Sequence, residues 1–281
     1  MNASEENVVE TETITLPKSG KRAMIVTINR PHKQNCFNTK VVYSLANIFH
    51  QIANHHNYKN CQDDDALAAV IFTGKGTTFC AGADLSDPPN PLEQSSDLPE
   101  ALFRNPVYQM SQISIPIIGA IQGYCITGGF ELALACDILI GDTTVKFRDT
   151  HVKFGLAPCW GLSQKLSKRI GPGRAKLISY SARPIDAKEA FSWGLIDELV
   201  PVGLSLKKAL EIADTIGQQD LKMVQRYKRA LEGGSMLDLG RGLVHERALG
   251  MAHYLEAVHD GTTFEQAKEY ITNESRPRSK L

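Results

Sequence analysis

Two glycine-containing turns carry the residues of this chain whose types and spacing could do chemistry. The first turn is Phe79-Cys80-Ala81-Gly82-Ala83-Asp84-Leu85, and the second is Gly123-Tyr124-Cys125-Ile126-Thr127-Gly128-Gly129-Phe130-Glu131. Small residues let a ligand approach the backbone closely, and a helix that begins at Gly128 or Gly129 offers N–H groups without an intrahelical partner. Two such donors that converge on one point would form an oxyanion hole.

Glu131 and His151 are the candidate acid/base groups beside these turns. Glu131 follows two glycines at an expected helix start, where the helix dipole alone also favours a carboxylate. His151 lies in the segment Phe147-Arg148-Asp149-Thr150-His151-Val152-Lys153-Phe154-Gly155, and an imidazole can donate or accept a proton near neutral pH. A structural histidine bonded to Asp149 is the alternative, and the residues alone leave both open.

Other catalytic motifs do not fit the chain. The turns match neither the phosphate loop G-x-x-x-x-G-K-[ST] nor the dinucleotide fingerprint G-x-G-x-x-G, and no G-x-S-x-G elbow occurs. The six cysteines lack the two-residue spacing of zinc and redox motifs, so no metal site is expected. Cys125 and Cys159 flank the presumed pocket without a recognisable base, which argues against a thiol nucleophile.

Alternating strands and helices are predicted to position these groups. Short β-branched runs predict strands over residues 23–28, 67–72, 117–121 and 138–140, and Asn38 is expected to cap a helix through Asn54. A short helix is expected between the last two strands, over Phe130–Cys136. This order predicts an α/β sheet with crossover helices, and the proline-rich segment Ser86–Leu98 is expected to be a flexible loop beside the ligand.

The chain divides by pattern into four expected parts. Residues 1–20 are polar and are expected to be a flexible N-terminal arm that ends in a Pro17–Gly20 turn. Residues 21–200 are expected to form the α/β core, and residues 201–272 a C-terminal helical region. Helix starts are predicted near Gly173, Asp186, Leu204 and Thr263, and residues 273–281 are expected to be a mobile tail.

Charge and hydropathy limit the classes of partner. Lys plus Arg and Asp plus Glu each number 31, so no nucleic-acid partner is expected. No run of about 18 apolar residues exists, so no membrane span is expected. The acidic first residues differ from a presequence, whereas Ser279-Lys280-Leu281 matches the receptor-read peroxisomal signal. We therefore expect a peroxisomal protein with the import receptor as a partner.

Together the motifs resemble the crotonase superfamily (enoyl-CoA hydratase/isomerase) over roughly residues 20–270. The segments that carry the resemblance are Ile28-Asn29-Arg30-Pro31 with Asn35, the turn from Phe79 to Leu85, Gly128 to Ala133, Cys136-Asp137, and Ala187-x-x-Ala190-x-x-x-Gly194-Leu195-Ile196-Asp197. The His151 segment and the Ser-Lys-Leu ending look most like the plant-type peroxisomal enoyl-CoA hydratases.

The resemblance implies a crotonase (ClpP-like) ββα spiral core with a C-terminal helical trimerisation region. It implies a homotrimer or a hexamer (dimer of trimers), and a CoA thioester substrate with no further cofactor. By position, the oxyanion hole would consist of the N–H groups of Ala83 and Gly128. The residues that would bind CoA or substrate are Arg30, Ala81, Gly82, Asp84, Leu85 and Phe264.

The acid/base pair is where this sequence departs from the family pattern of two glutamates. The first glutamate falls on Glu131 and the second on His151. The expected function is enoyl-CoA hydratase acting on trans-2-enoyl-CoA thioesters in peroxisomal fatty-acid β-oxidation. A Δ3,Δ2-enoyl-CoA isomerase with a single base and a non-catalytic acyl-CoA-binding protein remain alternatives. A dienoyl-CoA isomerase would need an acid where Cys159 stands.

Overall fold

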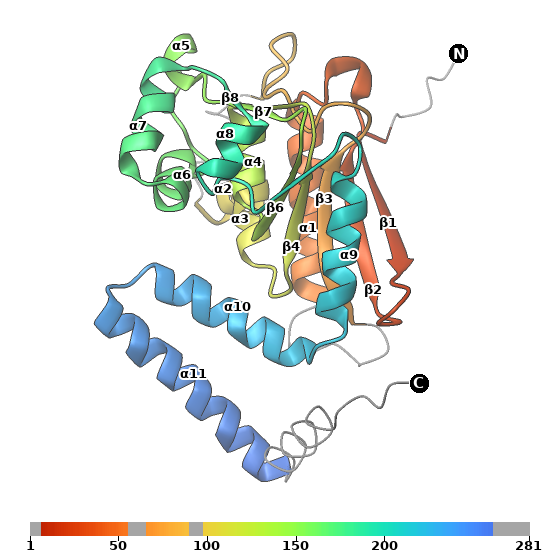
Figure 1. The fold of residues 1–281 in the computed structure, drawn as a ribbon, viewed down its shortest axis with the longest axis vertical. Helices are drawn as coiled ribbons and strands as arrows, with labels where there is room; N and C mark the ends of the chain where they lie inside the picture. The colour runs from red at the N-terminus through yellow and green to blue at the C-terminus, as the bar shows by residue number, and fades with distance from the viewer. Residues whose placement is uncertain (1–6, 56–65, 90–97, 261–281) are drawn as a thin grey trace, which may run out of the picture. The chain divides into compact units, whose positions relative to one another are not determined.

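The computed structural model describes residues 7–55, 66–89 and 98–260, which belong to two compact units with a boundary between Gln225 and Arg226 (Figure 1). The strands are β1 Val9–Thr15, β2 Arg22–Ile28, β3 Leu67–Gly74, β4 Ile117–Ile121, β5 Tyr124–Ile126, β6 Ile138–Asp142, β7 Lys146–Arg148, β8 Ile185–Asp186 and β9 Glu198–Val200. The α-helices are α1 Thr39–His55, α2 Leu98–Phe103, α3 Pro106–Ser111, α4 Gly128–Leu134, α5 His151–Phe154, α6 Leu162–Ile170, α7 Pro172–Ser181, α8 Ala187–Ser192, α9 Ser205–Gly217, α10 Leu221–Ser235 and α11 Leu239–Asp260.

The first unit is built on a six-stranded sheet in the order β1-β2-β3-β4-β6-β9. All neighbours pair in parallel except β1 and β2, which form an antiparallel hairpin. A second, three-stranded sheet has the order β5-β7-β8. The predicted α/β architecture with crossover helices is therefore confirmed, and so are the four predicted strands, which correspond to β2, β3, β4 and β6.

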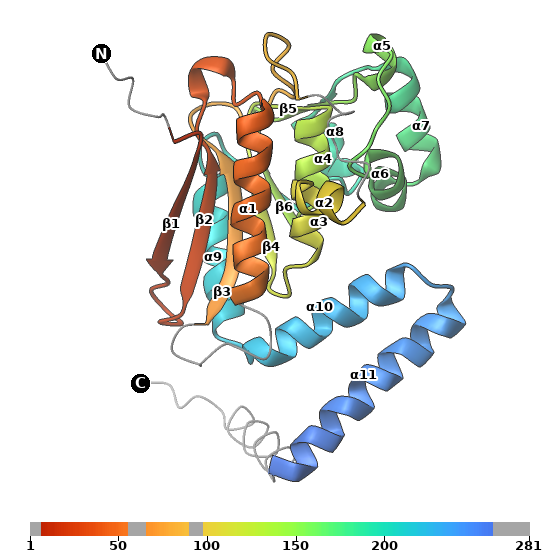
Figure 2. The same cartoon turned by 180° about the vertical axis from the view of Figure 1, so that it is seen from behind.

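Helices cover both faces of the large sheet, which explains why its central strands are apolar throughout. Every residue of β3 is buried, as expected for a parallel strand that is covered on both sides. Helix α9 covers the face seen in Figure 1, and α1 covers the face seen in Figure 2. On the α1 side, the rings of Phe49 and Phe72 meet edge to face with centroids 5.4 Å apart. On the α9 side, Ala209 and Ala213 pack against Ile71.

The N-terminal segment is partly a strand, so the prediction of a flexible arm over residues 1–20 is wrong for the residues described. Val9–Thr15 pairs along its whole length with β2. Its polar side chains are compatible with this pairing because β1 is an edge strand that exposes much of one face. The predicted turn is confirmed, since the Gly20 N–H donates to the Leu16 carbonyl oxygen (3.0 Å) and Gly20 has a φ of +68°.

Helix α4 begins at Gly128, one of the two starts considered for the second turn, whereas the short helix expected over Phe130–Cys136 was placed two residues too late. The first two positions of the helix are glycines, because a side chain would not fit at either one. A Cβ on Gly128 would approach the Phe37 ring to 2.4 Å, and one on Gly129 would approach the Cys80 carbonyl oxygen to 2.3 Å. The residue that turns the chain into the helix is Thr127, with φ of +51° and ψ of −108°.

The boundary of the core lies further along the chain than residue 200. The predicted helix start near Leu204 is confirmed by α9, but this helix packs against β3, β4 and β6 and so belongs to the sheet-containing unit. Asp214 of α9 also accepts hydrogen bonds from the backbone N–H groups of Lys18 and Ser19. The predicted separation of a core ending at 200 from a helical region starting at 201 is thus wrong.

The described part of the second unit consists of the last part of α10, from Arg226 onward, and the whole of α11. An ion pair between Arg226 and Glu256 joins the two helices. The turn between them is closed by Asp238, whose Oδ1 accepts from the Arg241 N–H at 2.9 Å. The prediction of C-terminal helices is confirmed as far as residue 260, whereas the predicted start near Thr263 and the tail 273–281 lie outside the described residues.

Asn35 is a buried amide that ties together the loops after β2 and β3. Its Oδ1 accepts from the Arg30 N–H (2.9 Å), and its Nδ2 donates to the carbonyl oxygens of Lys75 (2.9 Å) and Thr78 (2.6 Å). Asn35 is fully buried and has a φ of +55°, a conformation that asparagine adopts more readily than most residues. One side chain therefore satisfies three backbone groups from the two loops.

Asn35→Ala is expected to lower the free energy of unfolding by about 3 kcal/mol, because buried backbone groups left without a partner cost ~1–3 kcal/mol each. The measurement is urea unfolding followed by circular dichroism at a fixed protein concentration. Asn54→Ala is the matched control, since Asn54 is exposed on α1, where its Nδ2 lies 2.8 Å from His50 Nε2. The control should change stability by less than about 0.5 kcal/mol. Equal changes in the two variants would contradict the role assigned to Asn35.

Candidate active site

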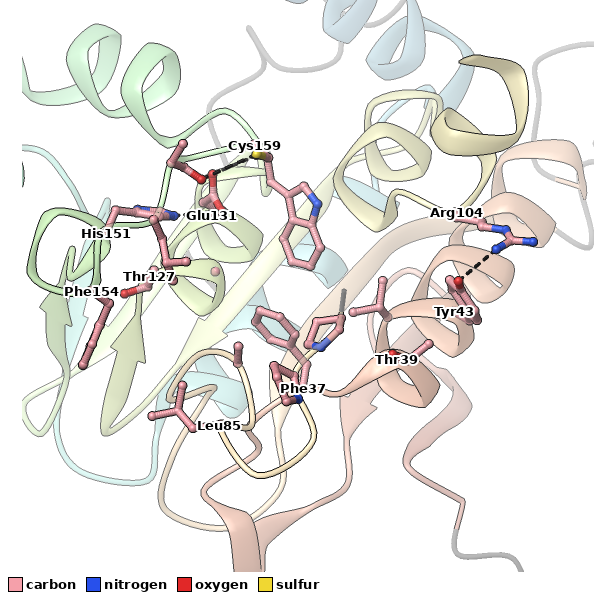
Figure 3. Close-up of a pocket in the computed structure, with 18 residues that line it drawn as sticks. Phe37, Thr39, Tyr43, Leu85, Arg104, Thr127, Glu131, His151, Phe154 and Cys159 are labelled. Atoms are coloured by element: carbon pink, nitrogen blue, oxygen red, sulfur yellow. Dashed lines mark hydrogen bonds and ion pairs between the residues drawn. The ribbon is translucent and has the colours of Figure 1, made fainter. Parts of the chain in front are cut away.

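A cavity of about 630 Å³ lies in the first unit and is bordered by both glycine-containing turns (Figure 3). Ala83 and Leu85 come from the first turn, and Thr127, Gly128 and Glu131 from the second. The segment that follows β7 closes the same cavity with His151, Phe154, Cys159 and Trp160. Segments far apart in the sequence thus meet here because each follows a strand, and the first two follow the neighbouring parallel strands β3 and β4.

Glu131 is the buried carboxylate of the cavity. It is 4% exposed and lies in the first turn of α4. Its Oε1 accepts hydrogen bonds from the backbone N–H groups of Trp160 (2.9 Å) and Leu162 (3.2 Å). These two bonds hold one oxygen and leave Oε2 directed toward His151, whose Nε2 is 3.9 Å away. The sequence-predicted acid/base candidates are therefore brought together, and Figure 3 shows them on one side of the cavity.

His151 is held from its other nitrogen by Asp149. The Nδ1 atom lies 2.8 Å from Asp149 Oδ1, which also accepts from the backbone N–H of His151 at 3.1 Å. His151 is 6% exposed and Asp149 is 3% exposed. The hydrogen bond to Asp149 that the sequence left as an alternative is thus present, and it occurs together with the approach to Glu131.

The surroundings raise the pKa values of both groups, although the causes differ. Burial raises the pKa of Glu131 above its ordinary value, although the N–H groups of Trp160 and Leu162 oppose the shift. Burial by itself lowers the pKa of His151, but the hydrogen bond and charge of Asp149, together with the charge of Glu131, raise it in sum. Glu131 therefore holds a proton more readily than an ordinary carboxyl group, and His151 stays protonated to higher pH than an ordinary imidazole.

Thr127 joins the two halves of the site at the cost of backbone strain. Its φ of +51° is positive, and a non-glycine residue in such a region costs about 1–3 kcal/mol. Three interactions hold it: its N–H donates to the Arg148 carbonyl oxygen (2.8 Å), its hydroxyl contacts the Thr150 hydroxyl (2.5 Å), and the same hydroxyl accepts from the Thr150 N–H (3.1 Å). The residue before Gly128 is thereby fixed to the residue before His151.

Ala83 and Gly128, the predicted oxyanion-hole residues, both border the cavity. Within the described part of the chain, neither N–H group donates a hydrogen bond to another residue. Gly128 is the first residue of α4, a position where the N–H group has no partner inside the helix. Convergence of these two groups on a substrate oxygen stays a prediction.

The predicted CoA-binding residues take different positions. Leu85 is 75% exposed and borders the cavity. Arg30 and Asp84 instead form a largely buried ion pair of 3.0 Å that braces the first turn, and the Gly82 carbonyl oxygen accepts from the Phe37 N–H. The Ala81 N–H donates to the Gln34 carbonyl oxygen. Phe264 lies outside the described residues. Contact of any of these residues with CoA stays a prediction.

Several residues of the site carried no sequence signal. The Trp160 ring packs on Phe37 with centroids 5.1 Å apart and forms a wall of the cavity. At the opposite end of the cavity, the Arg104 guanidinium donates to the Tyr43 hydroxyl at 3.0 Å (Figure 3). Gly161 follows Trp160 and has a φ of +100° at the start of α6. A glycine at this position is the one sequence feature that could have indicated a turn beside Trp160.

The thiols fit the prediction of small core residues where they are buried. Burial raises the pKa of Cys80 to about 12 and also raises the pKa of Cys125, so neither is a ready nucleophile. Cys159 is exposed in the cavity wall, and its Sγ contacts the Ala157 carbonyl oxygen.

In the ranges 7–55, 66–89 and 98–260, no group of three His, Cys, Asp or Glu residues could hold a metal ion. Over the same ranges, no helix is long and apolar enough to cross a membrane.

Comparison with known proteins gives a consistent result. The family model described as enoyl-CoA hydratase/isomerase matches residues 20–261. The chain is 38% identical to the "Probable enoyl-CoA hydratase 1, peroxisomal" of Arabidopsis thaliana over 98% of this chain and 100% of the relative. It is 31% identical to the "Short-chain-enoyl-CoA hydratase" of Clostridium acetobutylicum over 91% and 95% of the two chains. The crystal structure of an enoyl-CoA hydratase from Bacillus anthracis matches with a TM-score of 0.76, at 29% identity and over 96% and 97% of the chains.

Fold and site together define an enzyme of the crotonase type, with a buried carboxylate–imidazole pair beside two adjoining turns. The chain belongs to the enoyl-CoA hydratase/isomerase family. The resemblance and the fold class inferred from the motifs are thereby confirmed.

Asp84 is expected to make part of the stability dependent on acidic pH. Hydrogen bonds from Ser86 lower its pKa to about 2; burial opposes this shift, and Arg30 adds to it. The pKa of an unfolded aspartate is about 3.9, so Asp84 contributes stability above pH ~4 that is lost as the pH falls toward 2. Urea unfolding at a series of pH values should show that Asp84→Asn is less stable than the wild type near neutral pH. The gap should narrow between pH ~4 and ~2, and two parallel curves would contradict this assignment.

Proposed function

We propose that the protein is an enoyl-CoA hydratase that adds water across the double bond of trans-2-enoyl-CoA thioesters. The observation that carries the proposal is the approach of His151 Nε2 to Glu131 Oε2, 3.9 Å apart in the cavity wall. Hydration needs one group to accept a proton from water and another to deliver a proton to Cα. A buried carboxylate and an imidazole that face each other in the cavity meet this need, and the names of the relatives agree with it.

In the proposed reaction the N–H groups of Ala83 and Gly128 bind the thioester oxygen. Negative charge develops on this oxygen when water attacks Cβ, because the electrons of the double bond move toward the carbonyl group. Donors already in place stabilise that charge without reorganisation, and the loss of one donor in comparable sites costs about 3–4 kcal/mol in the barrier. The CoA thioester is the substrate, and the proposal includes no further cofactor and no metal.

Glu131 and His151 divide the two proton transfers. Glu131 as a carboxylate takes a proton from water while the water oxygen bonds to Cβ. His151 as an imidazolium gives the proton on Nε2 to Cα, and the product is the 3-hydroxyacyl thioester. The proton on Glu131 then returns to His151, after the 3.9 Å gap between Oε2 and Nε2 has shortened to hydrogen-bond distance. Each cycle consumes one water molecule and restores both groups.

CoA is proposed to run along the first turn, beside Ala81, Gly82 and Leu85. Arg30 and Asp84 brace this turn through their ion pair, and Phe264 is proposed to contact CoA as in the family pattern. Assembly into a homotrimer or a dimer of trimers is proposed from the same resemblance. Large apolar side chains exposed on the described part of the second unit support a buried interface in an assembly: Leu231, Leu239, Leu243, Val244 and Leu255.

The proposal predicts that Glu131→Gln and His151→Gln each lower kcat by ~10²–10⁴, because each removes one general acid or base. Affinity for a CoA ester should stay nearly constant, since each change removes a proton-transfer group, and at position 131 glutamine also keeps the shape of the glutamate side chain. The wild type should show a pH–rate curve with an alkaline limb, because His151 must be protonated to donate and its raised pKa places the loss of rate above pH ~6.5. This limb should disappear in His151→Gln. The assay follows 3-hydroxyacyl-CoA by mass spectrometry with short, medium and long trans-2-enoyl-CoA substrates.

Two outcomes would overturn parts of this function. A wild-type pH–rate curve in His151→Gln would remove His151 from the chemistry and favour the single-base isomerase, which converts trans-3-enoyl-CoA into the conjugated isomer. Tight binding of enoyl-CoA without turnover of either substrate would favour the non-catalytic acyl-CoA-binding protein. A panel with both substrate classes therefore separates all three functions.

A role in peroxisomal fatty-acid β-oxidation is proposed from the printed name of the Arabidopsis relative and from Ser279-Lys280-Leu281. If this tripeptide is the carboxyl terminus recognised by the import receptor, deleting it should leave a fluorescently tagged protein diffuse in the cytosol. The tag is placed at the N-terminus, and fluorescence microscopy with a peroxisomal marker measures the overlap. Substitution of Arg278 by alanine is the control. Persisting peroxisomal fluorescence in the deleted form would contradict a direct role of the tripeptide.

A further inference from the structure

Asp149 occupies a position behind His151 that the function proposed above does not use. Its carboxylate meets Nδ1 of the imidazole, whereas the opposite nitrogen, Nε2, meets Glu131. The carboxylate also accepts from the backbone N–H of His151 and from the Ser179 hydroxyl of α7. A carboxylate that is 3% exposed and has three donors is fixed in place.

We propose that Asp149 is a positioning residue for the reaction, which holds the proton of His151 on Nδ1 and so makes Nε2 the atom that exchanges protons in the cavity. The proposal rests on the proposed role of His151 as an acid/base. It adds a third group to that pair, in the order Asp149, His151, Glu131. Asp149 itself touches neither the cavity nor the reacting atoms.

The hydrogen bond to Asp149 determines the tautomer of neutral His151. An ionised carboxylate can only accept hydrogen bonds, so the 2.8 Å contact requires that Nδ1 carry a hydrogen. The neutral ring then has its lone pair on Nε2, facing the carboxyl group of Glu131. In the other tautomer the lone pair of Nδ1 would face the negative charge of Asp149, which is repulsive. Asp149 therefore selects the tautomer that can take back a proton from Glu131.

Neighbouring negative charges stabilise the protonated form of His151. The charged groups that act on it are Asp149 from its own segment and Glu131 from α4. Helix α7 packs against α5, and its contribution to this carboxylate is the neutral hydroxyl of Ser179. Asp149 favours the imidazolium through both its hydrogen bond and its charge, while burial opposes it. The group that must donate to Cα is thus kept protonated to higher pH.

The testing variant is Asp149→Asn, which keeps the shape of the side chain but removes the charge and offers an N–H donor to Nδ1. We expect kcat for trans-2-enoyl-CoA hydration to fall by ~10²–10⁴ with little change in KM, and the alkaline limb of the pH–rate curve to move to lower pH. Asp142→Asn is the matched control. Asp142 is equally buried and likewise accepts from a backbone N–H two residues on, that of Thr144, but it lies outside the cavity lining. Its pH–rate curve should keep the wild-type shape.

A second readout does not depend on activity. Nuclear magnetic resonance of the protein with isotope-labelled histidine reports which ring nitrogen carries the hydrogen and at what pH each ring titrates. The His151 signal is identified by its loss in His151→Gln. In the wild type we expect the Nδ1–H tautomer, and in Asp149→Asn a shift of the His151 titration to lower pH.

The outcomes separate this proposal from the one on which it rests. If His151→Gln loses activity while Asp149→Asn keeps the wild-type kcat, pH–rate curve and His151 titration, the role of Asp149 is wrong and the acid/base role of His151 stands. If His151→Gln keeps the wild-type pH–rate curve, the acid/base role of His151 is wrong, and the positioning role in catalysis fails with it. A lowered kcat in Asp149→Asn with an unchanged His151 titration and tautomer would show a merely structural role and would also overturn the proposal.

Discussion

The carboxylate of Glu131 is almost fully buried, and the surrounding structure depends on keeping it usable there. Removing an ionised carboxylate from water costs several kcal/mol unless partners replace the lost hydration. Helix α4 cannot supply these partners alone, so they come from other segments: two N–H groups at the start of α6 and the imidazole of His151. The fold of the segment after β7 is therefore fixed by the requirement that it return to Glu131 twice, once through a side chain and once through the backbone.

Close packing around the start of α4 is the second consequence of this arrangement. The helix enters between the Phe37 ring and the Cys80 carbonyl oxygen, where Gly128 and Gly129 leave no room for a Cβ. The Phe37 ring packs against the Trp160 ring, and the backbone N–H of Trp160 donates to Glu131. A change at Gly128 would thus reach the carboxylate from both sides, through the helix that carries Glu131 and through the Phe37 ring that supports Trp160.

The sequence predicted those parts of the fold whose signals are local. Strands β2, β3, β4 and β6 contain short, mostly apolar runs, and they were found because burial on both faces leaves that pattern. Strand β1 was missed because an edge strand tolerates alternating polar residues, and β5, β7 and β8 because two or three residues carry no period. Glu131 and His151 were found through motif order, but their approach to each other depends on the path of the whole chain. The same holds for Trp160 and Arg104, which reach the cavity from segments without any motif, and for Thr127, whose positive φ only the folded neighbours can impose.

The strained Thr127 also has a consequence for motion. Its hydroxyl forms hydrogen bonds with the hydroxyl and the N–H of Thr150. These bonds connect the loop that leads into α4 with the loop that leads into α5. Thermal displacements of the two loops should therefore be correlated, with Glu131 and His151 moving together. Such coupling preserves the separation of the two groups better than it preserves the position of either one, and a proton passed between them depends on the separation.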